Sequence, residues 1–191
     1  MRTFSIKPSL TLKGRTFKGL RGYAGKPFHP PLTDIPIAAY LLAAVFDVIS
    51  AAADDHQAWA HELWHAATFV FVAGAAVSVL AAATGMVDWL TSTQKGTQAR
   101  RTANTHAAVM ITVTLLTVGD IIWRVIQYDD RTTPVGIAVL SVAIAALVSI
   151  GATYGGTLVF DYGFNVETAG DSPVWHVSET DVLPGQQNTG A

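Results

Sequence analysis

The sequence predicts an all-α, polytopic membrane protein: an antiparallel bundle of four transmembrane helices with extended N- and C-terminal tails. Half of the 191 residues are hydrophobic and only 14% are charged, whereas soluble domains carry about 25% charged residues. Four long stretches are almost free of charge, and each is close to the length of about 20 residues that a helix needs to cross a bilayer. Their apolar residues are continuous rather than alternating, which favours helices over a closed barrel.

The uncharged stretches define the helices in order. They are Ile35–Ala53, which contains only Asp47, then Leu63–Val87, Thr102–Gly119 and Thr132–Phe160. We therefore predict helices at about residues 35–52, 64–90, 105–127 and 134–160, which together form a transmembrane domain of residues 34–160. The flanking segments are a basic tail over residues 1–33 and an acidic, polar tail over residues 161–191.

The basic residues orient the bundle in the membrane. Four crossings place both tails and the segment 91–104 on one face, which we call side A, and place 53–63 and 128–133 on the opposite face, side B. Side A holds ten of the twelve basic residues: Arg2, Lys7, Lys13, Arg15, Lys18, Arg21, Lys26, Lys95, Arg100 and Arg101. The positive-inside rule makes side A cytoplasmic. We therefore expect a protein of the bacterial inner membrane with both termini in the cytoplasm.

Composition also excludes several classes of protein and site. A sequence pI of about 6.3 argues against a nucleic-acid-binding protein. The chain has no cysteine, which excludes disulfides, thiolate zinc sites and cysteine-ligated iron–sulfur clusters. No nucleophile elbow, Walker A or Rossmann motif is present, so we assign no catalytic residue and favour a non-enzymatic role. The expected partners are the lipid bilayer and other membrane-protein subunits.

Three charged residues lie within the predicted helices. Asp120 and Arg124 are four residues apart with the acid first, which is the favourable order for a pair on one helix face. Asp47, near the side B end of the first helix, could join them. Charged groups inside a membrane are costly and usually serve a purpose. The two interpretations are a buried ion pair that locks helices together and a step in proton or ion transfer.

A second group of polar residues gathers on side A. His29 precedes the first helix, His106 opens the third, Asp88 ends the second, and Gly155 and Gly156 end the fourth. Two histidines from different elements of a bundle are what a b-type haem requires for its axial ligands. With Asp88 they could instead hold a divalent metal. The simplest alternative is that both histidines bind headgroups or helix ends.

Side B carries a literal H-E-x-x-H motif. Its members are His61, Glu62 and His65, and on a helix the two histidines would share one face and could bind zinc while Glu62 acts as a base. A third ligand would have to come from upstream: His56, Asp54 or Asp55. The alternatives are a bound metal without hydrolysis and plain capping of a helix end at the membrane interface.

Small residues recur in the predicted helices and favour close packing within the chain. Gly74, Ser78 and Ala82 follow one another at intervals of four residues, and Gly151 and Gly155 form a GxxxG pair. Lipid supplies no hydrophobic drive between helices, so such residues permit tight helix contacts. The sequence contains no convincing internal repeat.

Several short motifs together resemble a known family. They are GKPFHPPL at 25–32, Asp47, GMVDW at 85–89, His106 and GGTLVFDYGFNV at 155–166. In this order they are similar to a bacterial family of predicted four-helix membrane proteins, a domain of unknown function with a His-Pro-x-His-Pro signature. The resemblance covers about residues 25–166.

The resemblance implies that three of the residues above are the positions of interest. These are His29, Asp88 and His106, and the Rieske-type iron–sulfur domain of some relatives implies membrane electron transfer. The chain departs from the family pattern at Lys26, where the first histidine of the signature is expected, and at Tyr154, where tryptophan is usual. Lys26 removes one ligand from any site with several histidines.

These observations rank three functions. The first is a redox or electron-transfer membrane subunit with haem b held by His29 and His106. The second is a non-catalytic accessory subunit of a larger membrane complex. The third is a zinc hydrolase built on His61, Glu62 and His65.

Overall fold

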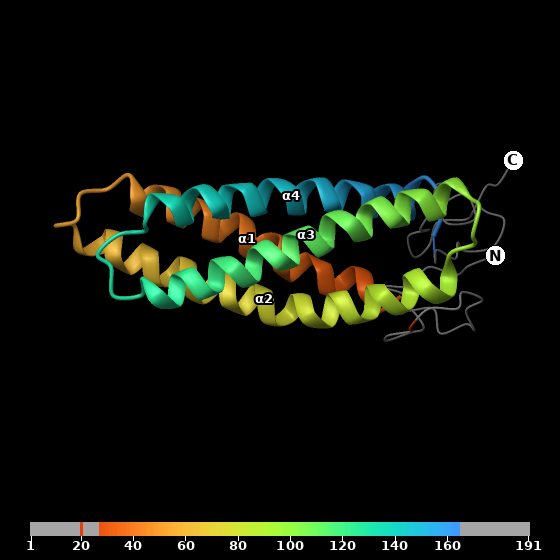
Figure 1. Cartoon of the computed structure of the whole chain (residues 1–191), viewed down its shortest axis with the longest axis horizontal. Coiled ribbons are helices and arrows are strands. Elements are labelled where there is room, and N and C mark those ends of the chain that lie inside the picture. Colours follow the sequence, from red (N-terminus) through yellow and green to blue (C-terminus); the bar gives the residue numbers. More distant parts are fainter. Residues whose placement is uncertain (1–19, 21–26, 165–191) are drawn as a thin grey trace, which may run out of the picture.

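The computed structural model describes Leu20 and residues 27–164, and this part of the chain folds into four long helices (Figure 1). They are α1 (His29–Ala51), α2 (Ala58–Ser92), α3 (Gln98–Ile126) and α4 (Val135–Phe160). The predicted all-α class is confirmed. Most of the two predicted tails lies outside the described residues.

Three helices begin earlier than the sequence predicts. α1 starts at His29 because Pro30 and Pro31 occupy its first turn, where a fixed φ and a missing N–H are tolerated. α2 starts at Ala58 and contains the whole H-E-x-x-H motif. α3 starts after Thr97, whose hydroxyl oxygen accepts a hydrogen bond from the backbone N–H of Arg100 at 3.1 Å. Absence of charge therefore marks the segment inside the hydrocarbon, whereas the helices continue beyond it.

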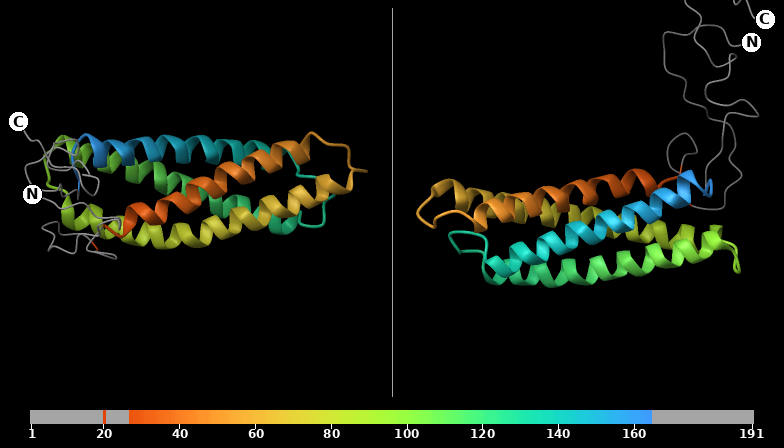
Figure 2. Two further views of the ribbon diagram at one scale, coloured as in Figure 1. Left: turned by 180° about the vertical axis from the view of Figure 1, so that it is seen from behind. Right: turned by 90° about the horizontal axis from the view of Figure 1, so that it is seen from above.

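The helices run alternately up and down (Figure 2). The side A end of the bundle contains the start of α1, the turn between α2 and α3, and the end of α4 (Figure 1). The side B end contains the α1–α2 and α3–α4 loops. α1 packs against both α2 and α4, α3 packs mainly against α4, and α2 barely touches α3. The bundle is thus two helical hairpins joined chiefly through α1 and α4.

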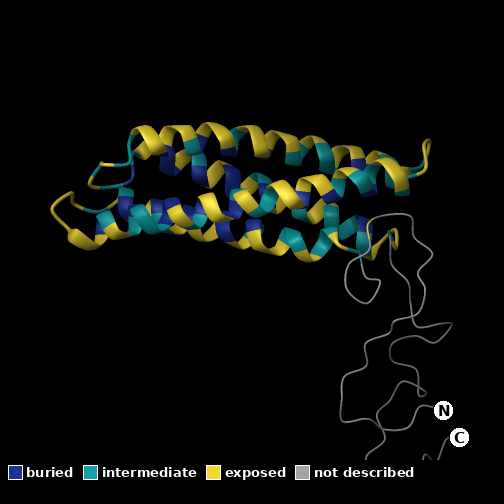
Figure 3. Ribbon diagram, turned by 90° about the horizontal axis from the view of Figure 1, so that it is seen from below, coloured by how far each residue is buried: buried dark blue, intermediate teal, exposed yellow. Residues whose placement is uncertain are grey.

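The outer surface of the bundle is apolar. Figure 3 shows exposed residues along the outside of the helices, and many of them are large and hydrophobic. Examples are Phe69, Val79, Leu115, Val125 and Val139, which are between 64% and 68% exposed. Each helix is long and apolar enough to cross a membrane. The protein is therefore a multi-pass membrane protein whose helices contact lipid.

The interior is small and tightly packed. Its core consists of Tyr40, Ala43, Ala67, Phe71, Val113, Ile144 and Val148. A Cβ atom on Gly74 would lie 2.5 Å from the Cβ of Ala39, and one on Gly151 would lie 2.6 Å from the sulfur of Met110. These glycines let α2 approach α1 and α4 approach α3. The small residues thus serve contacts within the chain, in agreement with the prediction.

Candidate functional site

His29 is held at the side A end by the second helix of its own hairpin. Its Nδ1 lies 2.9 Å from the carbonyl oxygen of Ala81 on α2. A carbonyl can only accept, so Nδ1 carries the hydrogen and the lone pair of the ring is on Nε2. One turn further along α2, a Cβ atom on Gly85 would lie 2.6 Å from Cε1 of the ring. Gly85 therefore provides the space that the imidazole occupies.

His106 is held in the same way in the second hairpin. Its Nδ1 lies 2.8 Å from the carbonyl oxygen of Gly151 on α4, which again leaves the lone pair on Nε2. A Cβ atom on Gly155 would lie 3.4 Å from Cε1 of this ring. Among the described residues, neither Nε2 atom takes part in a hydrogen bond. Both rings are half-buried.

The two hairpins thus repeat one structural unit. In each, a histidine at the side A end of the first helix donates to a carbonyl of the second helix, and a glycine four residues after that carbonyl faces the ring. The repeat cannot be recognised in the sequence, because each unit consists only of one histidine, one glycine and a backbone carbonyl. Of its parts, sequence reasoning missed the Ala81 and Gly151 carbonyls and Gly85.

Both histidine units lie in the half of the bundle that is nearer to side A (Figure 1). The Asp88 carboxylate accepts a hydrogen bond from the backbone N–H of Leu20 at 3.1 Å. In the described part of the chain, Asp88 and the two histidines do not bring three ligand atoms within 4.8 Å of one another. His29 and His106 therefore each offer one nitrogen donor, whereas the Asp88 carboxylate is hydrogen-bonded to the backbone of Leu20.

The two glycines predicted to line the site at the end of α4 face different neighbours. Gly155 faces His106, whereas the neighbour nearest to a Cβ atom on Gly156 is Phe160 of the same helix, at 3.9 Å. Consecutive helix positions point about 100° apart, so two adjacent glycines cannot both face one ring. Gly156 therefore does not face the His106 ring, whereas Gly85, on α2, faces the His29 ring.

A second polar cluster lies deeper in the bundle, toward side B. The side chains of Asp47, Asp120 and Arg124 are 0% exposed. The Arg124 guanidinium donates to both oxygens of Asp47, and its Nε lies 3.3 Å from Oδ1 of Asp120. Arg124 thereby connects α1 to α3.

All four helices supply groups to this cluster. Arg124 also donates to Ser141 on α4 at 2.7 Å and to Thr68 on α2 at 3.3 Å. Its guanidinium carbon lies 5.2 Å from the ring centre of Trp64 and 4.6 Å from that of Phe71. The cation–π contacts and hydrogen bonds together offset the cost of burying a charge.

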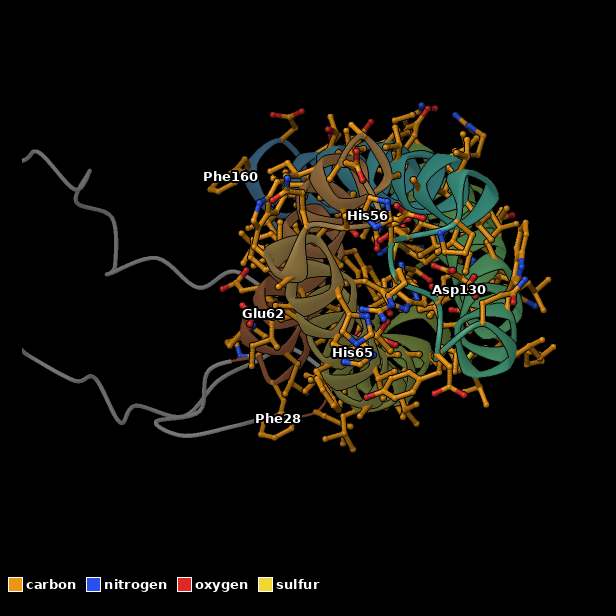
Figure 4. All side chains as sticks on the ribbon, turned by 90° about the vertical axis from the view of Figure 1, so that its left-hand side faces the viewer. Phe28, His56, Glu62, His65, Asp130 and Phe160 are labelled. Carbon is orange, nitrogen blue, oxygen red and sulfur yellow. The ribbon has the colours of Figure 1, made fainter. Side chains whose placement is uncertain are left out.

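The H-E-x-x-H motif binds the α3–α4 loop. Nδ1 of His61 lies 3.0 Å from the carbonyl oxygen of Asp130, and Nε2 of His65 lies 3.1 Å from that of Tyr128. The His65 ring stacks on Tyr128 with ring centres 4.5 Å apart. Glu62 is exposed and points away from the bundle axis (Figure 4). Each histidine therefore already uses one ring nitrogen to hold the loop.

The upstream acidic residues form a separate group. Asp54, Asp55 and His56 bring three ligand atoms within 4.8 Å of one another, and all three residues are exposed. Figure 4 shows His56 apart from His65 at the side B end. In the described residues, no group of three such ligands includes His61, Glu62 or His65.

A comparison with known families agrees with this architecture. A family model described as a predicted membrane protein, DUF2231, matches residues 25–168. The chain belongs to the DUF2231 family. The match contains all four helices and both polar clusters. No curated protein and no solved structure matches the chain.

Proposed function

We propose that this DUF2231 protein binds a b-type haem between His29 and His106 and carries electrons in the bacterial inner membrane. The observation that carries the proposal is the matched pair of imidazoles. Each ring donates through Nδ1 to a backbone carbonyl, and each keeps an Nε2 lone pair available. A hydrogen bond on the second ring nitrogen is the usual way in which a protein orients a metal-ligating histidine.

The donor set suits haem better than a divalent metal. Haem needs one nitrogen above and one below its plane, because the porphyrin supplies the other four. Two histidines from separate hairpins meet that need without a third protein ligand. Because Gly85 and Gly155 have no Cβ atom, both rings can lie against helix backbone, where packing holds their orientation.

Two histidine ligands also indicate the kind of chemistry. Haem held by His29 and His106 would supply a reversible one-electron couple. The chain's own contribution is to fix the two rings and to hold the site at one end of the bundle. The basic residues of side A support a cytoplasmic location for this site and for both termini. An electron carrier also requires a redox donor and an acceptor, so we infer other membrane redox proteins as partners.

The test is an optical spectrum of detergent-purified protein expressed with haem supply. We expect a Soret band and a sharp α band on reduction, with about one haem per chain. His29→Ala and His106→Ala should each lower haem affinity by more than about tenfold, since even outer-shell changes cost that much. His56→Ala is the matched control, because this histidine is 89% exposed at the other end.

Two outcomes would reject the haem. One is wild-type protein that stays colourless after haem is added. The other is a spectrum that survives both alanine substitutions unchanged. A protein that is colourless but copurifies with membrane subunits would favour the accessory role instead.

A further inference from the structure

The buried cluster contains more negative than positive charge. It has two carboxylates, Asp47 and Asp120, against one guanidinium, Arg124, and all three side chains are 0% exposed. With both acids ionised, the cluster carries a net charge of −1 within the bundle. An uncompensated charge in a low-dielectric interior is costly, and such a group takes up a proton instead.

The two carboxylates are partnered very unequally. Asp47 accepts hydrogen bonds from both terminal nitrogens of Arg124, from Thr133 at 3.2 Å and from Ser141 at 2.6 Å. For Asp120, Oδ2 has only long contacts, at 3.4 Å to Arg124 and 3.5 Å to Ser141. Asp47 is therefore the ionised partner of Arg124.

Asp120 also keeps one oxygen without a hydrogen bond. In the described part of the chain its Oδ1 is buried and accepts no hydrogen bond, although the Nε of Arg124 lies 3.3 Å away; that Nε has no hydrogen-bond partner either. The hydroxyl oxygen of Thr117, three residues earlier on the same helix, is also buried and has no partner. Residues three apart are neighbours on a helix face. A threonine hydroxyl can accept as well as donate a hydrogen bond, so it can accept one from a protonated Oδ1 of Asp120.

We propose that Asp120 is a proton-binding site inside the membrane domain and that its Oδ1 carries a proton at neutral pH. Uptake of one proton forms an O–H bond on Oδ1 and changes the net charge of the cluster from −1 to 0. The O–H group then donates to Thr117, directly or through one water molecule. This site is independent of the proposed haem, which lies at the side A end.

A chain of hydrogen-bonded groups leads from this cluster toward side B. Ser141 bridges the two carboxylates, and Asp47 accepts from Thr133. The backbone N–H of Thr133 donates to the hydroxyl of Ser50, which in turn donates to the Ala60 carbonyl at the α1–α2 end. The charged groups that act on Asp120 are Arg124 and Asp47.

No carboxylate continues the chain toward side A. α3 contains no Asp, Glu, Lys or Arg between Thr102 and Gly119, and its titratable residue in this stretch, His106, belongs to the side A end. The proton therefore enters and leaves from side B, and the site is a terminal store rather than a channel across the membrane.

Infrared spectroscopy of the full-length protein in lipid tests this inference. A buried carboxylic acid gives a C=O band that is separate from carboxylate and amide bands and shifts in D2O. We expect this band in the wild type at neutral pH and its complete loss in Asp120→Asn. Asp88→Asn is the matched control, because Asp88 is also a mostly buried helical carboxylate, and it should keep the band.

The outcomes decide the question in either direction. A wild type without the band, or a band that persists in Asp120→Asn, would overturn the proposal. Asp120→Glu guards against a variant that fails to fold, since it keeps a carboxylic acid and should keep the band at a shifted frequency. A band that moves in neither variant would assign the proton to another residue and reject the site.

Discussion

The two hairpins are alike at the side A end and different in the middle. At the end, each provides a histidine, a carbonyl and a glycine in the same arrangement. Eighteen residues after its histidine, the first helix of each hairpin carries a charged residue, which is Asp47 in one and Arg124 in the other. These two residues pair with each other.

The difference shows how one arrangement of helices can serve two purposes. Identical groups from the two halves make a site with two equivalent donors, which suits a ligand with two faces. Opposite charges at corresponding depths make a contact that joins the halves, because like charges there would repel. The middle of the bundle thus joins the two hairpins through an ion pair, whereas the side A end presents two histidines held in matching ways.

The largest expected effect comes from breaking the central contact. Asp47→Asn leaves Arg124 without its main counter-charge and should lower the free energy of unfolding by about 3 kcal/mol. This value is at the lower end for a broken buried pair because Asp120 can release its proton and pair with Arg124. Unfolding in detergent, followed by circular dichroism, measures the loss.

Asp120→Asn is the companion to that experiment. If Asp120 is already neutral, the amide replaces an acid of the same shape and should cost less than about 1 kcal/mol. Equal losses in the two variants would contradict the unequal roles of the two carboxylates.

The next effect distinguishes the two histidine units. A Cβ atom at position 85 would lie 2.6 Å from the His29 ring, whereas one at position 155 would lie 3.4 Å from the His106 ring. Gly85→Ala should therefore displace His29, cost about 1 to 3 kcal/mol and reduce haem content. Gly155→Ala should be close to neutral, because alanine favours the helix by up to about 1 kcal/mol.

Thermal unfolding and haem content measured side by side test this contrast. If Gly155→Ala lost more haem than Gly85→Ala, the result would contradict the prediction that the closer contact, between position 85 and the His29 ring, matters more.

The smallest effect is expected at the side B end. His65→Ala removes one hydrogen bond to the α3–α4 loop and should cost about 1 kcal/mol. Because the histidines of this motif already bind loop carbonyls, we expect the zinc content of the purified protein to be the same in this variant and in the wild type. Elemental analysis measures it, with Glu62→Gln as the control on the exposed face. Zinc that is present in the wild type and lost in His65→Ala would contradict this expectation and support a zinc site at the H-E-x-x-H motif.

The sequence alone determined the membrane architecture and part of each cluster. Runs without charge identify four spans because charged groups are costly in hydrocarbon. An even number of crossings between His29 and His106 places both at one end. Spacing of four residues places Asp120 beside Arg124 on one helix face.

Only the tertiary structure decided which groups complete the clusters. The carbonyls of Ala81 and Gly151 have no signature, because every residue has the same backbone group. Hydroxyls such as Ser141 are frequent in these helices, and most of them bond to their own helix, so which ones reach the cluster depends on how the helices pack. Short-range rules act along one helix, whereas a site shared by four helices depends on their relative positions.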